Sequence, residues 1–196
     1  MNLKGTKTLE NLLKAFAGES QARARYMMYA AKAREEGLEQ IAAIFEETAH
    51  NEFVHGRRFF HLAAAGLEGE MPADVEIQAS YPVAIGTTVE NLKAAAAGEH
   101  HEWANMYPEF ADVAEAEGFK EIATAFRMIA KAETAHETRY RKLVENLEKG
   151  IVFKRDGKYF WKCRECGYIH EGTAAPKTCP VCGYPQAYFE LFVENY

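Results

Sequence analysis

The sequence predicts a mainly α-helical protein, with a four-helix bundle followed by a small domain built around four cysteines. Three observations lead to this prediction. The first three quarters of the chain contain two copies of a helical-hairpin pattern, and glutamate and histidine occupy helix positions where apolar residues belong. All four cysteines lie between Cys163 and Cys182. We therefore expect a bundle over residues 1–149 and a metal-binding module over residues 150–196.

Composition narrows the classes of protein to which the chain can belong. Hydrophobic residues make up 48% of the chain, which is enough to bury a substantial core. The net charge is -6 and no basic run is present, which argues against nucleic acid as a partner. The uncharged stretches are too short to cross a bilayer, so we expect no membrane partner.

The N-terminal residues and the cysteines bear on where the protein works. Residues 1–5 lack the apolar segment of a secretory signal, which favours the cytoplasm. In that reducing compartment, clustered cysteines indicate a bound metal and not disulfides.

An internal repeat defines the organisation of the bundle. Residues 8–12 (Thr-Leu-Glu-Asn-Leu) resemble residues 88–92 (Thr-Val-Glu-Asn-Leu) at an offset of 80. Beyond Gly37 and Gly118 the offset becomes 81. Two copies of this length are too long and too few for a solenoid, so they indicate a duplicated helical hairpin.

The helix ends carry recognisable signals. Thr8 and Thr88 are candidate N-caps, and Thr87 with Glu90 offers an alternative capping box for the second half. Glycine readily takes the left-handed conformation after a helix. Gly37 and Gly118 therefore predict where the first helix of each half ends.

The two hairpins are joined by a long connection. Residues 66–87 contain several glycines and prolines and show no helical stripe. A crossover of this length between the second and third helices is typical of ferritin-like four-helix bundles. We therefore expect that fold for the first domain.

The inward stripes of the four predicted helices carry charge. Glutamate is almost never fully buried unless it is paired or bound to a metal. Each stripe nevertheless contains glutamate, and two of them add histidine three residues later, on the same helix face. These candidate metal ligands are Glu19, Glu52, His55, Glu99, Glu102, Glu133 and His136.

This set has the pattern of a di-metal carboxylate site. Such sites take a glutamate from each of two helices and a Glu-x-x-His motif from each of the other two. The repeat aligns Glu52 with Glu133 and His55 with His136. Oxygen ligands with a few imidazoles suit iron or manganese, and reactivity toward oxygen species favours iron.

Other polar residues of the helices fit a solvated surface. Glu47 and His50 form another Glu-x-x-His, but they lie off the stripe and match no such motif in the second half. We interpret His61, His100 and His101 as surface residues and Trp103 as a packing residue.

Two tyrosines are candidates for contact with the ligands. Tyr26 lies seven residues after Glu19, on the same helix face, and is placed to donate a hydrogen bond to the ligand shell. Tyr107 is off the simple helical count. However, Pro108 must disturb that helix, and a kink or bulge there can turn Tyr107 inward.

The C-terminal segment contains two Cys-x-x-Cys-Gly knuckles, formed by Cys163, Cys166, Cys179 and Cys182. The glycine after each second cysteine lets backbone N–H groups turn toward the sulfurs. A domain this small does not fold securely without a metal. A structural zinc ribbon would use the same ligands and geometry.

Surrounding apolar and aromatic residues favour iron at the four cysteines. They limit solvent access and so help to set the reduction potential of a bound metal. The residues expected to wrap the site are Tyr159, Trp161, Tyr168, Pro180, Tyr184, Pro185 and Phe189.

With these motifs in place, the chain resembles the rubrerythrin family over essentially its whole length. The resemblance rests on Glu-x-x-His at 52–55 and 133–136, Glu-x-x-Glu at 99–102, and the run from Cys179 to Pro185. The short separation between the knuckles is also the form that rubrerythrins carry. No ligand position departs from the pattern of the family.

The resemblance implies a ferritin-like di-iron domain followed by a rubredoxin-like domain with one iron. It implies that one iron is held by Glu19, Glu52, Glu133 and either His55 or Glu102. The other is held by Glu99, Glu52, Glu133 and His136. It further implies catalytic roles for His55, Glu102, Tyr26 and Tyr107.

The activity that the resemblance implies is the reduction of hydrogen peroxide. Electrons would come from rubredoxin or an NAD(P)H-dependent reductase, and the protein would be a homodimer in which the tetracysteine iron of one subunit serves the other. Two other functions remain open at this point. One is iron storage with ferroxidase activity, and the other is non-catalytic binding of zinc or iron.

Overall fold

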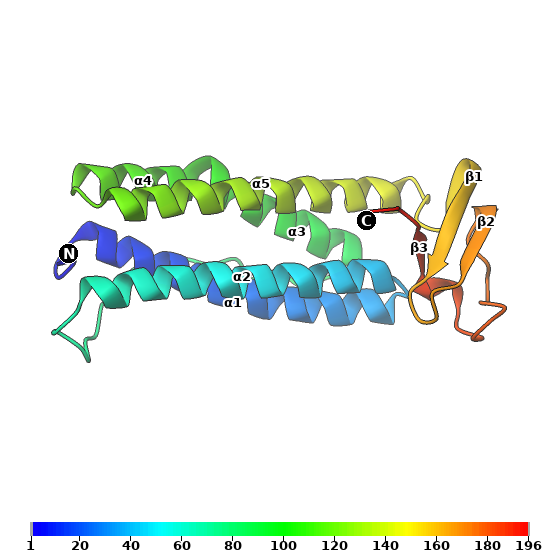
Figure 1. The fold of residues 1–196 in the computed structure, drawn as a ribbon, viewed down its shortest axis with the longest axis horizontal. Helices are drawn as coiled ribbons and strands as arrows, with labels where there is room; N and C mark the ends of the chain where they lie inside the picture. The colour runs from blue at the N-terminus through cyan, green and yellow to red at the C-terminus, as the bar shows by residue number, and fades with distance from the viewer. Residues whose placement is uncertain (1, 196) are drawn as a thin grey trace.

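A computed structural model describes residues 2–195 and contains a long helical bundle with a small sheet at one end (Figure 1). The helices are α1 (Lys7–Glu35), α2 (Glu39–Gly66), α3 (Thr88–His101), α4 (Tyr107–Ala116) and α5 (Lys120–Glu148). A π-helical turn, η1 (Glu102–Met106), joins α3 to α4, so the two form one interrupted helix of the bundle. The predicted four-helix architecture is confirmed.

The caps at the helix starts correct one prediction and confirm another. Thr6, not Thr8, caps α1, because its hydroxyl accepts from the N–H of Leu9. The hydroxyl of Thr8 instead donates to Glu117 at 2.6 Å. The capping box formed by Thr87 and Glu90 is present, so Thr87 and not Thr88 caps α3.

The predicted glycine stops of the first helix in each half are present. Gly37 has a φ of 75° and Gly118 a φ of 88°, both in the left-handed region. The N–H of Leu38 then donates to the carbonyl of Ala33 at 2.9 Å, which closes the end of α1.

The connection from α2 to α3 is long, as predicted, and it runs along α1. No helix or strand forms between Gly66 and Thr88. The hydroxyl of Tyr81 donates to the carbonyl of Lys14 at 3.0 Å, and that of Tyr29 donates to the carbonyl of Ala84 at 2.7 Å. These two bonds hold the crossover against the bundle.

Two apolar clusters fill the bundle, and the polar residues lie between them. One cluster includes Phe59, Tyr107 and Phe126. The other includes Phe45 and Tyr140. Along every helix the two clusters leave out the segment that carries the buried glutamate. Close packing on both sides therefore surrounds a single polar layer.

The C-terminal module is a three-stranded antiparallel sheet with strand order β2-β1-β3. Its strands are β1 (Lys154–Cys163), β2 (Ile169–Ala174) and β3 (Phe189–Leu191), with a short 3-10 helix, η2 (Gln186–Tyr188), before the last. The module lies against the turn between α1 and α2 (Figure 1). A Cβ added at Gly37 would lie 3.7 Å from the Cβ of Ala187.

Within residues 2–195, no helix combines the length and the apolar character needed to cross a membrane.

Candidate metal centres

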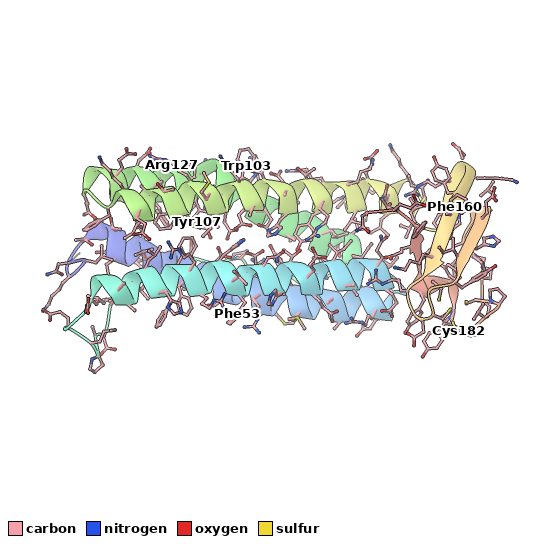
Figure 2. The ribbon with its side chains drawn as sticks, in the orientation of Figure 1. Phe53, Trp103, Tyr107, Arg127, Phe160 and Cys182 are labelled. Carbon is pink, nitrogen blue, oxygen red and sulfur yellow. The ribbon has the colours of Figure 1, made fainter. Side chains whose placement is uncertain are left out.

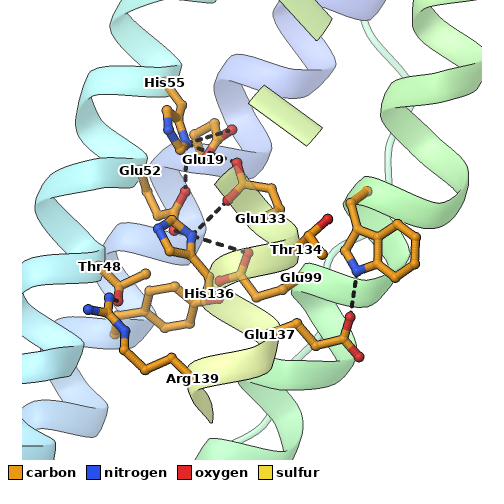
Figure 3. A network of polar contacts seen from close by, with 12 residues as sticks. Glu19, Thr48, Glu52, His55, Glu99, Glu133, Thr134, His136, Glu137 and Arg139 are labelled. Atoms are coloured by element: carbon orange, nitrogen blue, oxygen red, sulfur yellow. Dashed lines mark hydrogen bonds and ion pairs between the residues drawn. The ribbon is translucent and has the colours of Figure 1, made fainter. Parts of the chain in front are cut away.

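Four buried carboxylates, one from each helix of the bundle, form the polar layer. Glu19 on α1, Glu99 on α3 and Glu133 on α5 are 0% exposed, and Glu52 on α2 is 1% exposed. Figure 3 shows them pointing toward one another, together with His55 and His136. The heptad-like stripe of each helix aims its glutamate at the bundle axis, as the sequence predicted.

The side chains form two overlapping groups of potential metal ligands. One contains Glu19, Glu52, His55 and Glu133, and the other contains Glu52, Glu99, Glu133 and His136. Within each group the ligand atoms lie within 4.8 Å of one another. Glu52 and Glu133 belong to both groups, which is the arrangement that carboxylates bridging two metal ions require.

The histidines lie close to the carboxylates that the two ligand groups share. Nδ1 of His55 is 2.9 Å from Glu133 Oε1 and 3.2 Å from Glu52 Oε2. Nδ1 of His136 is 2.7 Å from Glu133 Oε2. Yet His136 Nδ1, both oxygens of Glu133 and one oxygen each of Glu19, Glu52 and Glu99 have no hydrogen bond of acceptable geometry.

Buried polar atoms without partners are costly, and here they converge on one space. Four carboxylates carry the charge that two divalent cations would neutralise. The donor set therefore fits a di-metal carboxylate site.

Crowding perturbs the ionisation of these groups in the protein without ions. Burial, followed by the charges of Glu52 and Glu133, raises the pKa of Glu19 well above its ordinary value. Burial and then the charge of Glu52 raise the pKa of Glu99 to about 8. Burial opposes protonation of His136, but the close carboxylates of Glu133 and Glu52 raise its pKa to about 12. Bound protons thus neutralise part of the carboxylate charge that metal cations would otherwise neutralise.

Both candidate tyrosines reach the ligand layer, each from one half of the repeat to the other. The hydroxyl of Tyr26 donates to Glu99 Oε1 at 2.5 Å. The hydroxyl of Tyr107 donates to Glu19. Each tyrosine therefore holds a carboxylate that belongs to only one ligand group, and neither contacts a shared one.

The π-helical turn explains why Tyr107 points inward. The N–H of Tyr107 bonds to the carbonyl of Glu102, five residues back, which adds one residue to the turn. The predicted bulge beside Pro108 is therefore present. The extra residue of this turn also accounts for the change in the repeat offset from 80 to 81. Glu19 and Glu99 differ by 80, whereas Tyr26 and Tyr107 differ by 81. The change falls at η1, before Gly37 and Gly118.

Glu102 is the one predicted ligand that the structure leaves outside the cluster. It is half-buried at the start of η1 and, within residues 2–195, belongs to neither ligand group. Burial and then the charge of Glu99 raise its pKa well above the ordinary value. His55 occupies the ligand group for which the sequence left His55 and Glu102 as alternatives.

The structure corrects the interpretation of Trp103. Its indole Nε1 donates to Glu137 at 2.5 Å, so Trp103 has a specific polar contact in addition to its packing. His100 is exposed, as expected, but its Nδ1 also lies 3.2 Å from Glu137. Glu137 was not singled out from the sequence. Its position next to His136, with Arg141 one turn later, was the available signal.

The remaining surface predictions agree with the structure. Glu47 and His50 are exposed, and Glu47 pairs with Arg139 at 2.7 Å. His61 and His101 are exposed.

The four cysteine sulfurs converge at the spacing of a tetrahedral site. The sulfurs of Cys163 and Cys182 are 3.8 Å apart, and those of Cys166 and Cys179 are 3.7 Å apart. A tetrahedron with metal–sulfur bonds of about 2.3 Å has edges of about 3.8 Å. All four cysteines are free thiols, so the donor set fits one metal ion.

The two knuckles have the backbone geometry that the sequence predicted. Gly167 has a φ of 79° and Gly183 a φ of 76°. The backbone N–H of Tyr184 faces the sulfur of Cys182, and the backbone N–H of Tyr168 faces that of Cys166. These donors lower the pKa of the two thiols, whereas burial and the neighbouring sulfurs raise it, so that the pKa of Cys182 is about 12 in the protein without a metal. A bound cation would favour the thiolate form, which is the form that binds a metal.

The predicted aromatic shell is only partly formed. Trp161 is 0% exposed and Phe189 is 1% exposed, and both pack against Cys163 and Cys179. Tyr159 and Tyr184, at 43% and 38% exposure, lie at the surface. Cys166 is also exposed, which leaves one side of the site open to solvent. Figure 2 shows Cys182 in the module, away from Tyr107 in the bundle.

Fold and ligand geometry together define a class of protein. It is a ferritin-like bundle with a di-metal carboxylate centre, joined to a tetrathiolate metal module. The family model described as rubrerythrin matches residues 10–144, and the model for the rubredoxin-like domain of rubrerythrin matches residues 161–190. The chain belongs to the rubrerythrin family.

Curated relatives match the chain along its whole length. A rubrerythrin of Clostridium perfringens is 58% identical and covers 100% of this chain and 99% of its own. A rubrerythrin of Nitratidesulfovibrio vulgaris is 47% identical with the same coverage.

Solved structures agree on the fold. A structure of nigerythrin in a partially reduced state has a TM-score of 0.62 at 34% identity, covering 97% of this chain and 92% of the other. A bacterioferritin of Desulfovibrio desulfuricans has a TM-score of 0.65 at 23% identity, covering 73% of this chain and 81% of the other. The second shares the bundle alone.

Proposed function

We propose that this protein is a non-haem di-iron peroxidase that reduces hydrogen peroxide to water. The observation that carries the proposal is the presence, in one chain, of a cluster for two metal ions and a tetrathiolate site. Iron bound in the bundle would supply the two electrons that cleave the O–O bond, and iron at the cysteines would pass electrons one at a time. Iron storage alone would not need the tetrathiolate site.

We propose that Tyr26 and Tyr107 orient Glu99 and Glu19 and hold protons at their phenolic oxygens. Burial raises the pKa of Tyr26 well above its ordinary value, and the charge of Glu99 raises it further. Tyr107 is affected in the same way, by burial and then by the charge of Glu19. Both phenols therefore stay protonated and act as fixed donors beside the ligands.

We propose that His55 and Glu102 alternate as ligands when the oxidation state changes. Two ferrous ions balance the charge of four carboxylates, so a fifth carboxylate would add uncompensated negative charge in a buried site. Neutral His55 is then the better ligand. Loss of two electrons adds positive charge and favours Glu102. His55 lies inside the ligand group and Glu102 outside it, which is the placement that the proposal assigns to the reduced state.

The supply of electrons completes the proposal. Rubredoxin or an NAD(P)H-dependent reductase is proposed as the donor to the tetrathiolate iron, whose Cys166 side is exposed. We propose a homodimer in which that iron serves the di-iron site of the other subunit. We also propose two domains, residues 1–149 and 150–196, and a cytoplasmic location, where the four thiols would stay reduced.

A single comparison tests the activity. The full-length iron-loaded protein is reduced with dithionite, freed of excess reductant and mixed with hydrogen peroxide or with oxygen. We expect faster reoxidation by peroxide, with stoichiometric peroxide loss. Rapid oxidation of added Fe(II) by oxygen, with slow loss of peroxide, would instead identify a ferroxidase. Zinc at both sites in protein purified without added metal would indicate non-catalytic metal binding.

A further inference from the structure

Glu137 is a buried carboxylate in the ligand-bearing region that belongs to neither ligand group. It is 7% exposed. Three side chains surround its oxygens. Trp103 Nε1 donates to Oε2 at 2.5 Å, Arg141 Nε donates to Oε1 at 2.5 Å, and His100 Nδ1 lies 3.2 Å from Oε2. Burial of a carboxylate is tolerated only where its hydrogen bonds and ion pairs offset the free energy of desolvation.

The contact from Trp103 to Glu137 joins α5, which carries ligands of both metal groups, to η1, which carries Glu102. Glu137 directly follows His136 on α5, and Trp103 directly follows Glu102 on η1. Figure 3 labels Glu137 in the same close view as Glu99 and Glu133, and the indole of Trp103 reaches it from η1. The bond thus fixes the π-helical turn against the helix that supplies a ligand to each metal group.

The bond from Trp103 to Glu137 is well placed to hold the π-helical turn in one orientation. A π-turn is rare and is retained where surrounding contacts hold it. Among the residues that the structure describes, Trp103 is the only side chain of η1 that forms a hydrogen bond. Rotation of this short turn would move Glu102, since the two residues are adjacent.

We propose that Glu137 is a positioning residue which, through Trp103, sets the orientation of η1 and hence the position from which Glu102 reaches the metal pair. The inference rests on the proposed role of Glu102 in the di-iron site. Arg141 and His100 hold the carboxylate of Glu137 in place from the solvent side, where their side chains are 61% and 49% exposed.

The test uses full-length protein loaded with ⁵⁷Fe and oxidised, because Mössbauer spectra separate the iron pair from the tetracysteine iron. Trp103→Phe keeps the ring but removes the donor. Glu137→Gln keeps a carbonyl that can accept from the indole, and Glu137→Leu keeps neither acceptor nor charge. Glu145→Gln, a partly exposed residue two turns later on α5, is the matched control.

We expect Trp103→Phe and Glu137→Leu to shift the quadrupole splitting of one iron of the pair, with the tetracysteine signal unchanged. Glu137→Gln should largely restore the spectrum of the unaltered protein, and Glu145→Gln should leave it unchanged. In a Glu102→Gln background the shift caused by Trp103→Phe should disappear, because the contact acts through Glu102. Misplacement of a ligand can also slow the reaction with peroxide by up to ~100-fold.

A lower melting temperature without any spectral shift would overturn the inference, since the contact would then only join two helices. A shift that persists in the Glu102→Gln background would overturn it too. If the unaltered protein takes up no iron pair, the proposed function fails together with the inference. If it does and Trp103→Phe has the unaltered spectrum, only the inference fails.

Discussion

Tyr26 donates a hydrogen bond to Glu99 across a distance of 2.5 Å, although 73 residues separate them in the chain. The counterpart is the bond from Tyr107 to Glu19, which runs in the opposite direction between the two halves of the repeat. Each half therefore supplies the phenol that holds the unshared carboxylate of the other. The two halves must pack together before either carboxylate is satisfied.

Replacing one of these tyrosines should remove its hydrogen bond to a carboxylate without removing a metal ligand. In Tyr26→Phe and Tyr107→Phe, a buried carboxylate loses its donor, which should lower the free energy of unfolding of the metal-free protein by about 1–3 kcal/mol. Metal content should be retained, and reoxidation by peroxide should be slower. Tyr29→Phe is the control, because Tyr29 bonds to a crossover carbonyl. Equal slowing in all three variants would contradict a role at the ligands.

The two Glu-x-x-His motifs of α2 should behave differently. Glu52→Ala removes a carboxylate shared by both ligand groups, so the metal pair should be lost while the tetracysteine metal remains. Glu47→Ala removes an exposed side chain and should change stability by roughly 0.5 kcal/mol or less. Elemental analysis and thermal unfolding of the two variants check this. Loss of the metal pair from both would mean that the wrong helix face was assigned.

His55→Ala tests the proposed alternation of ligands. The oxidised variant should still hold two irons, since Glu102 is available in that state, but its reaction with peroxide after reduction should be slow. Crystals of one preparation of the unaltered protein, examined oxidised and then chemically reduced, give the direct measurement. Unchanged distances from iron to His55 and Glu102 would refute the exchange.

The tetracysteine site should behave as a one-electron iron centre. Reduction should bleach its visible absorption bands, and peroxide should restore them quickly only when the iron pair is present. Glu52→Ala therefore should bleach normally and reoxidise slowly. Fast reoxidation in that variant would show that electrons do not pass through the bundle site.

Removal of metal should make stability depend on pH in a defined direction. Burial and the charge of Glu52 raise the pKa of Glu99 to about 8, from an ordinary value of 4.5. Its contribution to stability is therefore complete below pH 4.5 and is lost as the pH rises toward 8.

His55 acts in the same direction. Burial opposes its protonation, but the close carboxylates of Glu133 and Glu52 raise its pKa from 6.5 to about 9. The melting temperature of metal-free protein should thus fall between pH 5 and pH 8 by calorimetry, and metal-loaded protein should show a weaker fall. Calorimetric titration with Fe(II) in buffers of different ionisation enthalpy should detect proton release. A metal-free melting temperature that rises over this range would contradict the crowded-carboxylate description.

The sequence alone predicted the helices, the crossover and all six residues that meet in the metal cluster, together with a seventh, Glu102, that lies outside it. These depend on local periodicity, because a stripe at helical spacing directs its residues to one face whatever the neighbouring helix contributes. The cysteine knuckles were predictable for a similar reason, since both pairs and their glycines lie close together in the chain. The inward turn of Tyr107 was predictable from Pro108.

Contacts between distant segments were decided only by the tertiary structure. Periodicity gives the face of a helix but not its partner, so it could not show that Tyr26 reaches Glu99 or that Trp103 reaches Glu137. Thr6 and not Thr8 caps α1, because in the folded chain the hydroxyl of Thr8 donates to Glu117, the residue that follows α4. Glu102 lies outside both ligand groups although it follows Glu99 by one helical turn, because a shared helix face does not fix how close a side chain comes to those of the other helices.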